Sequence, residues 1–101
     1  MNNLFISYDL KNPGQNYDRV IAAIKTLGSW AKVQYSLFYV SSVYSAKQAA
    51  EIVRRAQDAN DTLIVIDTTA NEAVWYGIDQ EVSTFMQQNW NRQAAMASRY
   101  Y

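Results

Sequence analysis

The strongest constraint on the fold of this chain is a pattern that occurs twice: a β-favouring run, an amphipathic helical stretch and a second β-favouring run. The first unit opens with the short apolar run Leu4–Tyr8. Its helix is indicated by one continuous hydrophobic stripe, formed by Tyr17, Val20, Ile21, Ile24 and Leu27. We expect Asn16 to cap the start of this helix and Gly28 to cap its end.

The run Trp30–Val43 contains few turn-forming residues and is longer than an average strand. We expect it to divide near Gln34 and Tyr35 into two strands, and one bent strand is the alternative. A capping-box pair, Ser45 and Gln48, then opens a second helix. Four side chains of that helix are expected to be buried: Ala49, Ile52, Val53 and Ala56.

The apolar run Leu63–Ile66 supplies a fourth strand, and helical spacing resumes from Ile78 to Asn89. Together these elements predict an α+β domain of the ferredoxin-like kind, reading β-α-β-β-α-β, with the antiparallel sheet order 4-1-3-2. We expect residues 1–90 to form this single domain, with an added C-terminal helix over about 78–90. Residues 91–101 are expected to be a loosely ordered tail.

Composition excludes several kinds of site. The chain has no cysteine and no histidine, which removes disulfides, thiolate metal sites and the commonest general base. Nine basic and nine acidic residues give a formal net charge of zero, which argues against strong non-specific binding of nucleic acid. We see no signal-peptide pattern and no long apolar span, and therefore expect a cytoplasmic protein without a membrane partner.

The first and fourth strands are apolar at successive positions, and thus on both faces of the expected sheet. The helices of this fold cover one face only. An exposed apolar sheet face is unfavourable for a monomer, so we expect a homodimer that buries it.

Asp9 is the main candidate for a functional residue, because it ends the first strand where the chain leaves the sheet. In the expected topology Asp61, Tyr35 and Ser36 lie at the same corner. Oxygen ligands suit Mg²⁺ or Mn²⁺, so Asp9 and Asp61 are candidate metal ligands and Asp9 is the candidate catalytic residue. Alternatively, both carboxylates are turn residues that accept main-chain hydrogen bonds. Asp67 is excluded, because it should lie at the opposite end of the sheet.

A nucleic-acid surface near that corner is expected to use five residues: Lys11, Arg19, Lys32, Tyr35 and Ser36. Aromatic rings in such a surface stack on bases. A solvated charged face, with the aromatic residues in the core or an interface, is the alternative. The turn Asn12-Pro13-Gly14 lacks the glycine spacing and the Lys-Ser/Thr pair of a phosphate-binding loop.

Two segments resemble the Cas-two family of CRISPR-associated proteins. Leu4–Asp9 resembles the opening strand of that family, which ends in Tyr-Asp, and Lys32–Phe38 resembles its second-to-third-strand signature. The likeness in element spacing covers residues 3–67. The chain is also similar to the virulence-associated protein D toxins. It is most similar to small SinR-like proteins, which share Tyr-Asp-Leu, the Pro-Gly turn and the step Trp75-Tyr76-Gly77.

The resemblance implies a ferredoxin-like homodimer in which Asp9 matches the proposed magnesium ligand of a nuclease. The Cas-two family also serves as a non-catalytic dimeric platform that holds DNA for an integrase. In this chain we expect the helix Ile78–Asn89 to replace the fifth strand that family members exchange. Two functions therefore compete: a metal-dependent nuclease acting on RNA or DNA through Asp9, and a non-catalytic dimeric interaction or regulatory module.

Overall fold

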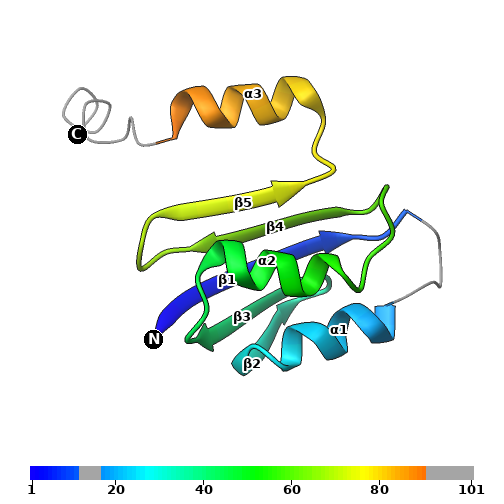
Figure 1. Cartoon of the computed structure of the whole chain (residues 1–101), viewed down its shortest axis with the longest axis vertical. Coiled ribbons are helices and arrows are strands. Elements are labelled where there is room, and N and C mark those ends of the chain that lie inside the picture. Colours follow the sequence, from blue (N-terminus) through cyan, green and yellow to red (C-terminus); the bar gives the residue numbers. More distant parts are fainter. Residues whose placement is uncertain (12–16, 91–101) are drawn as a thin grey trace.

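The computed structural model describes residues 1–11 and 17–90. They form a mixed α+β domain with a five-stranded antiparallel sheet and three helices (Figure 1). The elements follow in the order β1 (Asn2–Asp9), α1 (Tyr17–Lys25), β2 (Gly28–Gln34), β3 (Leu37–Ser42), α2 (Ala46–Arg54), β4 (Thr62–Asp67), β5 (Glu72–Tyr76) and α3 (Gln80–Asn89). The expected turn at 12–14, the helix cap at Asn16 and the tail at 91–101 lie outside the described residues.

The strands lie in the order β2-β3-β1-β4-β5, and every neighbouring pair is antiparallel. The predicted four-stranded order 4-1-3-2 is therefore corrected to a five-stranded order, in which β5 pairs with β4 and forms a new edge. The expectation that a helix replaces the fifth strand is also wrong, because both β5 and α3 are present. Asp67 starts the turn between β4 and β5: its Oδ1 accepts the main-chain N–H groups of Thr69 (2.9 Å) and Ala70 (3.3 Å).

The division of the long β-favouring run is confirmed, since β2 and β3 form a hairpin. The turn is Tyr35-Ser36, and Ser36 adopts a positive φ of 72°, a conformation that reverses the chain without glycine. The capping box of α2 is also confirmed: Gln48 N–H donates to Ser45 Oγ (3.1 Å), and Ser45 N–H donates to Gln48 Oε1 (3.0 Å).

The expected helix cap at Gly28 is wrong, because Gly28 is the first residue of β2. Its role is to permit a close approach of two strands. A Cβ at this position would lie 2.1 Å from the carbonyl oxygen of Ser41 on β3. Glycine is therefore required here by the neighbouring main chain and not by a left-handed turn.

The core lies between one face of the sheet and helices α1 and α2 (Figure 1). Its strand residues alternate along the chain, as expected for one face of a sheet. They are Leu4, Ile6, Tyr8, Phe38, Val40, Leu63 and Val65. The helices contribute Val20, Ile24, Ala46, Ala49, Ala50 and Val53. Ile52 and Ala56, which we expected to be buried, are half-buried at the margin of this core.

Helix α3 lies apart from that core. It runs alongside the outer edge of β5, and none of its residues is buried (Figure 1). It begins two positions after the expected start at Ile78. Among the described residues, no helix is both long and apolar enough to span a membrane.

Candidate functional site

Asp9 lies at the end of β1, where it pairs with Thr62 of β4. The side chain is exposed and belongs to the sheet face opposite the core, because its neighbour Tyr8 points into the core. The main-chain carbonyl of Asp9 accepts a hydrogen bond from Thr62 Oγ1 at 3.4 Å. The carboxylate is thus open to solvent, as a ligand-binding carboxylate requires.

Asp61 has the opposite environment. It is 1% exposed, and each of its carboxylate oxygens accepts a main-chain N–H group: Oδ1 from Lys11 and Oδ2 from Asp58, both at 2.8 Å. Arg54 Nη1 donates to the main-chain carbonyl of Asp61 at 2.8 Å. This geometry is that of a loop-organising carboxylate, which ties the segment after β1 to the turn before β4.

The expected pairing of Asp9 with Asp61 as metal ligands therefore lacks geometric support. Asp9 faces solvent on the open side of the sheet, while both oxygens of Asp61 are occupied by main-chain donors. Within residues 1–11 and 17–90, no group of three or more acidic residues is arranged to hold a metal ion. Asp67 lies opposite Leu4 in the sheet register, which confirms that it is remote from Asp9.

A cluster of three tyrosines lies at the same corner. The buried Tyr8 ring is 6.3 Å from Tyr17, and Tyr17 is 6.3 Å from Tyr35, measured between centroids. The main-chain N–H of Tyr8 donates to the carbonyl of Ser36 at 3.2 Å. Burial raises the pKa of the Tyr8 hydroxyl above 10.0, and Tyr17 and Tyr35 raise this pKa further, while a hydrogen bond with the Ser36 side chain opposes the shift.

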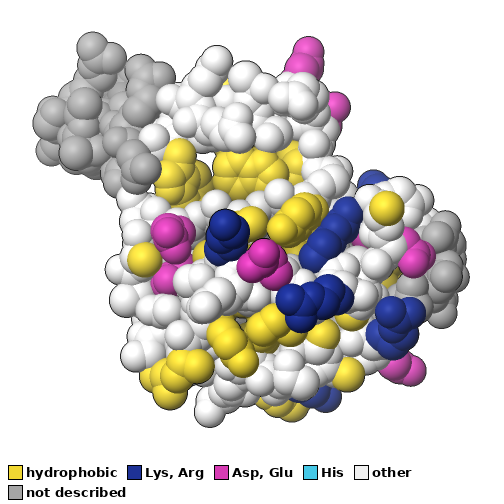
Figure 2. Space-filling model, viewed as in Figure 1, with side chains coloured by type: hydrophobic (Ala, Val, Ile, Leu, Met, Phe, Trp, Pro, Cys, Tyr) yellow, Lys and Arg dark blue, Asp and Glu magenta, His cyan; other side chains and the backbone are white. Residues whose placement is uncertain are grey.

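Three of the five expected nucleic-acid residues come together in this corner. Tyr35 is 79% exposed, and the Lys32 Nζ lies 5.3 Å from the centroid of its ring, beside Ser36 in the hairpin turn. Lys11 is exposed just after β1, and Arg19 is exposed on the first turns of α1. On the face viewed in Figure 2, basic side chains are interspersed with acidic ones and form no continuous basic surface.

The sheet face opposite α1 and α2 carries a second set of apolar strand residues, and we call it the open face. One cross-strand row runs through all five strands: Ala31, Tyr39, Phe5, Ile66 and Ala73. A second row adds Leu37, Ile64 and Trp75, with the polar Ser7 of β1 between Leu37 and Ile64. The rings of Phe5 and Tyr39 pack at 5.4 Å. Apart from Asp9, the described strand residues on this face are uncharged.

Sequence reasoning identified the two apolar faces of β1 and β4 but not the full row. Tyr39 and Phe5 each alternate with core residues along their strands. This alternation could have placed both side chains in the row on the opposite face. The helical stripe predicts only a core position for Tyr17. Its contact with Tyr35 depends on the hairpin turn, which brings residues distant in the sequence together. Comparisons with protein-family models, curated proteins and solved structures found no match to this chain.

Proposed function

We propose that this protein is a non-catalytic homodimeric interaction module of the ferredoxin-like class, in which two copies associate through their open faces. One observation carries the proposal: the uncharged apolar rows on the open face. The core-facing side of the sheet is covered by α1 and α2, whereas Phe5, Tyr39 and Ile66 remain partly exposed on the other side. Contiguous exposed apolar surface of this kind marks interaction sites.

The lack of charged strand residues near the centre of the open face favours a second copy of the chain as its partner. Apposition of two such faces buries no charged strand residue near the centre, because Asp9 lies at one end of β1. Desolvating an unpaired charge would oppose association. Two sheets that pack face to face lie about 10 Å apart with interdigitated side chains, and Phe5 and Tyr39 provide side chains of the required size.

The test is the mass of the full chain in solution, with 11.6 kDa expected for one copy. We expect twice this mass by light scattering at micromolar concentration. Phe5→Glu should yield the monomer, because it places a charge in the centre of the face. Ala22→Lys, on the exposed side of α1, is the matched control and should remain dimeric. A wild-type monomer at tens of micromolar would refute the proposal.

A second candidate is a metal-dependent nuclease, favoured by the exposed position of the Asp9 carboxylate and by the Cas-two resemblance. In a symmetric dimer, two copies of Asp9 would share Mg²⁺ or Mn²⁺. Tyr35 and Lys32 at the same corner would contact RNA or DNA by stacking and charge. Asp61 takes no part in this site, because its oxygens are already engaged.

Titration of the protein with MgCl₂ or MnCl₂ separates the two functions. A nuclease requires saturable changes of the amide resonances around Asp9 that disappear in Asp9→Asn, together with cleavage that the same substitution abolishes. The absence of a response at millimolar metal would leave the dimeric module as the function. Tyr35→Ala tests nucleic-acid binding independently, since this exposed ring contributes little to the core.

A further inference from the structure

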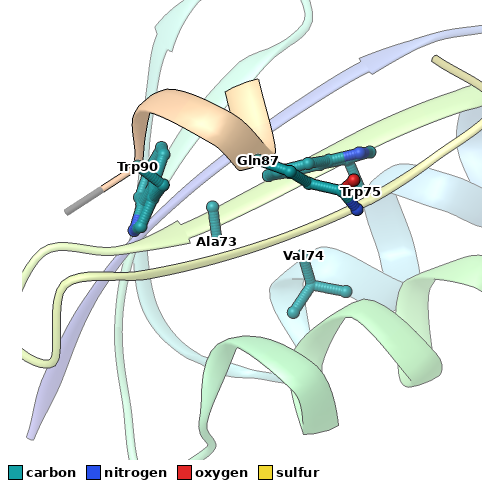
Figure 3. A pocket seen from close by; sticks show the side chains of 5 residues that line it. All are labelled: Ala73, Val74, Trp75, Gln87 and Trp90. Carbon is teal, nitrogen blue, oxygen red and sulfur yellow. The ribbon is translucent and has the colours of Figure 1, made fainter. Parts of the chain in front are cut away.

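A groove lies between α3 and the edge of β5 that does not pair with β4. The larger of its two adjoining hollows, about 390 Å³, is lined by Ala73, Val74, Trp75, Gln87 and Trp90 (Figure 3). The smaller, about 310 Å³, is lined by Lys47, Asn71, Glu72, Ala73, Val74 and Trp90. We call the two together the β5 edge groove. Figure 2 shows hydrophobic side chains between α3 and the rest of the molecule.

The lining places the groove beside the strand. Successive residues of a strand point to opposite faces of a sheet, and Figure 3 shows Val74 and Trp75 directed to opposite sides of β5. A hollow lined by three successive residues therefore borders the main chain of β5. Because β4 occupies the other edge, about half of the N–H and C=O groups of β5 face the groove, in the manner of an unpaired edge strand.

Two tryptophans form the aromatic wall of the groove. Their centroids are 6.4 Å apart, with the rings inclined by 56°. The Trp75 indole N–H donates to Ser83 Oγ at 2.8 Å, and the Trp90 indole N–H donates to the carbonyl of Asn71 at 3.1 Å. Both indole donors are thus used within the protein, so the rings offer a ligand their π surfaces, which attract cationic groups.

The acidic charge of the segment around the groove also favours a cationic ligand. Between Thr68 and Trp90 the sequence contains three acidic residues, Glu72, Asp79 and Glu81, and no lysine or arginine. Lys47 of α2 lines one end of the groove, where Glu72 is also present. Pairing of two β5 edges from two copies would bring these acidic segments together, and such like-charge contacts oppose association.

We propose that the β5 edge groove binds an extended peptide segment of a partner protein with lysine or arginine at alternate positions. The segment pairs with β5 as a sixth strand and rests cationic side chains against Trp75 and Trp90. Main-chain hydrogen bonds supply affinity in this mode of recognition, and the alternating side chains supply specificity. The groove shares Ala73 and Trp75 with the edge of the open face, but peptide pairing with β5 does not require the homodimer.

The test uses the full chain with Trp30→Phe, which leaves Trp75 and Trp90 as the two remaining tryptophans of three. The probe is a blocked nonapeptide of alternating arginine and valine. One control peptide replaces arginine by glutamate, and the other carries N-methyl groups at alternate residues and keeps the charge. We expect a saturable change in tryptophan fluorescence with the first peptide and about tenfold weaker binding of both controls.

Two protein variants sharpen the test. Glu72→Gln and Trp90→Ala should each weaken binding, while Gln80→Ala, at the start of α3, should not. Amide resonances of β5 should shift, and those of the opposite edge strand β2 should not. Equal binding of the N-methylated peptide, shifts confined to β2, or no binding at millimolar peptide would overturn the proposal. If the peptide bound only after Arg92 and Arg99 were replaced by glutamine, the groove would be assigned to this chain's own C-terminal residues. That result would also overturn the proposal.

Discussion

At the scale of single residues, Asp9 and Asp61 have opposite environments although they flank the same corner, since Asp9 is exposed and Asp61 is buried. Asp61→Ala would leave the N–H groups of Lys11 and Asp58 without their acceptors. We expect it to lower the free energy of unfolding by about 2–3 kcal/mol, whereas Asp9→Ala should change it by less than about 0.5 kcal/mol. Urea denaturation of both variants measures the difference. Equal stability of Asp61→Ala and the wild type would contradict the loop-organising role.

A second prediction at this scale concerns Tyr8. Burial raises the pKa of its hydroxyl above 10.0, and Tyr17 and Tyr35 raise this pKa further. A raised pKa in the folded state means that folding favours the neutral phenol. The associated stability is fully present below pH 10 and is lost as the pH rises through the folded-state pKa. The unfolding free energy should therefore fall above pH 10. In Tyr8→Phe this fall should be smaller, as urea denaturation between pH 8 and pH 11 would reveal.

The sequence predicted which residue types could form a site, but not which way their side chains point. Asp61 directly precedes β4. The direction of its side chain depends on the main-chain N–H groups of Lys11 and Asp58, which lie 50 and 3 positions away in the chain. Such hydrogen bonds across loops leave no periodic signal. The position of Asp9 followed more directly, because strand parity fixes its face once Tyr8 is assigned to the core.

At the scale of secondary-structure elements, the β2–β3 hairpin depends on Gly28. In Gly28→Ala the new methyl group would lie within 2.1 Å of the Ser41 carbonyl oxygen, so the strands must separate. We expect a loss of about 2 kcal/mol or more in unfolding free energy. Ser29→Ala, the next residue on the same exposed strand, is the control and should be nearly neutral. Both values follow from thermal or chemical denaturation.

Strand β5 is the element that the sequence failed to predict. Its residues Val74–Tyr76 favour strands, but the run is short and follows Glu72 and Ala73, which do not, and helical spacing resumes soon afterwards. Its stability comes from pairing with β4 and from the turn that Asp67 and Asn71 organise, the latter with φ of 55°. The capped helix α2 was predicted correctly because its signal is local.

At the scale of the whole molecule, both faces of the sheet carry apolar side chains, and within residues 1–11 and 17–90 helices α1 and α2 cover one of them. The sequence predicted this from β1 and β4, where apolar residues are successive. It could not give the extent of the open face, because β5 and the hairpin β2–β3 extend the same row at both ends. The row is therefore a property of the assembled sheet.

An obligate dimer through this face makes stability depend on protein concentration, because association stabilises the folded state by mass action. For a chain of this size, a tenfold rise in concentration should raise the melting temperature by about 3–5 °C. Phe5→Glu should melt at a lower temperature that is independent of concentration, since a buried unpaired charge prevents association. Ala22→Lys should retain the dependence of the wild type. A wild-type melting temperature that stays constant between micromolar and hundreds of micromolar would show that folding of this domain does not require the second copy.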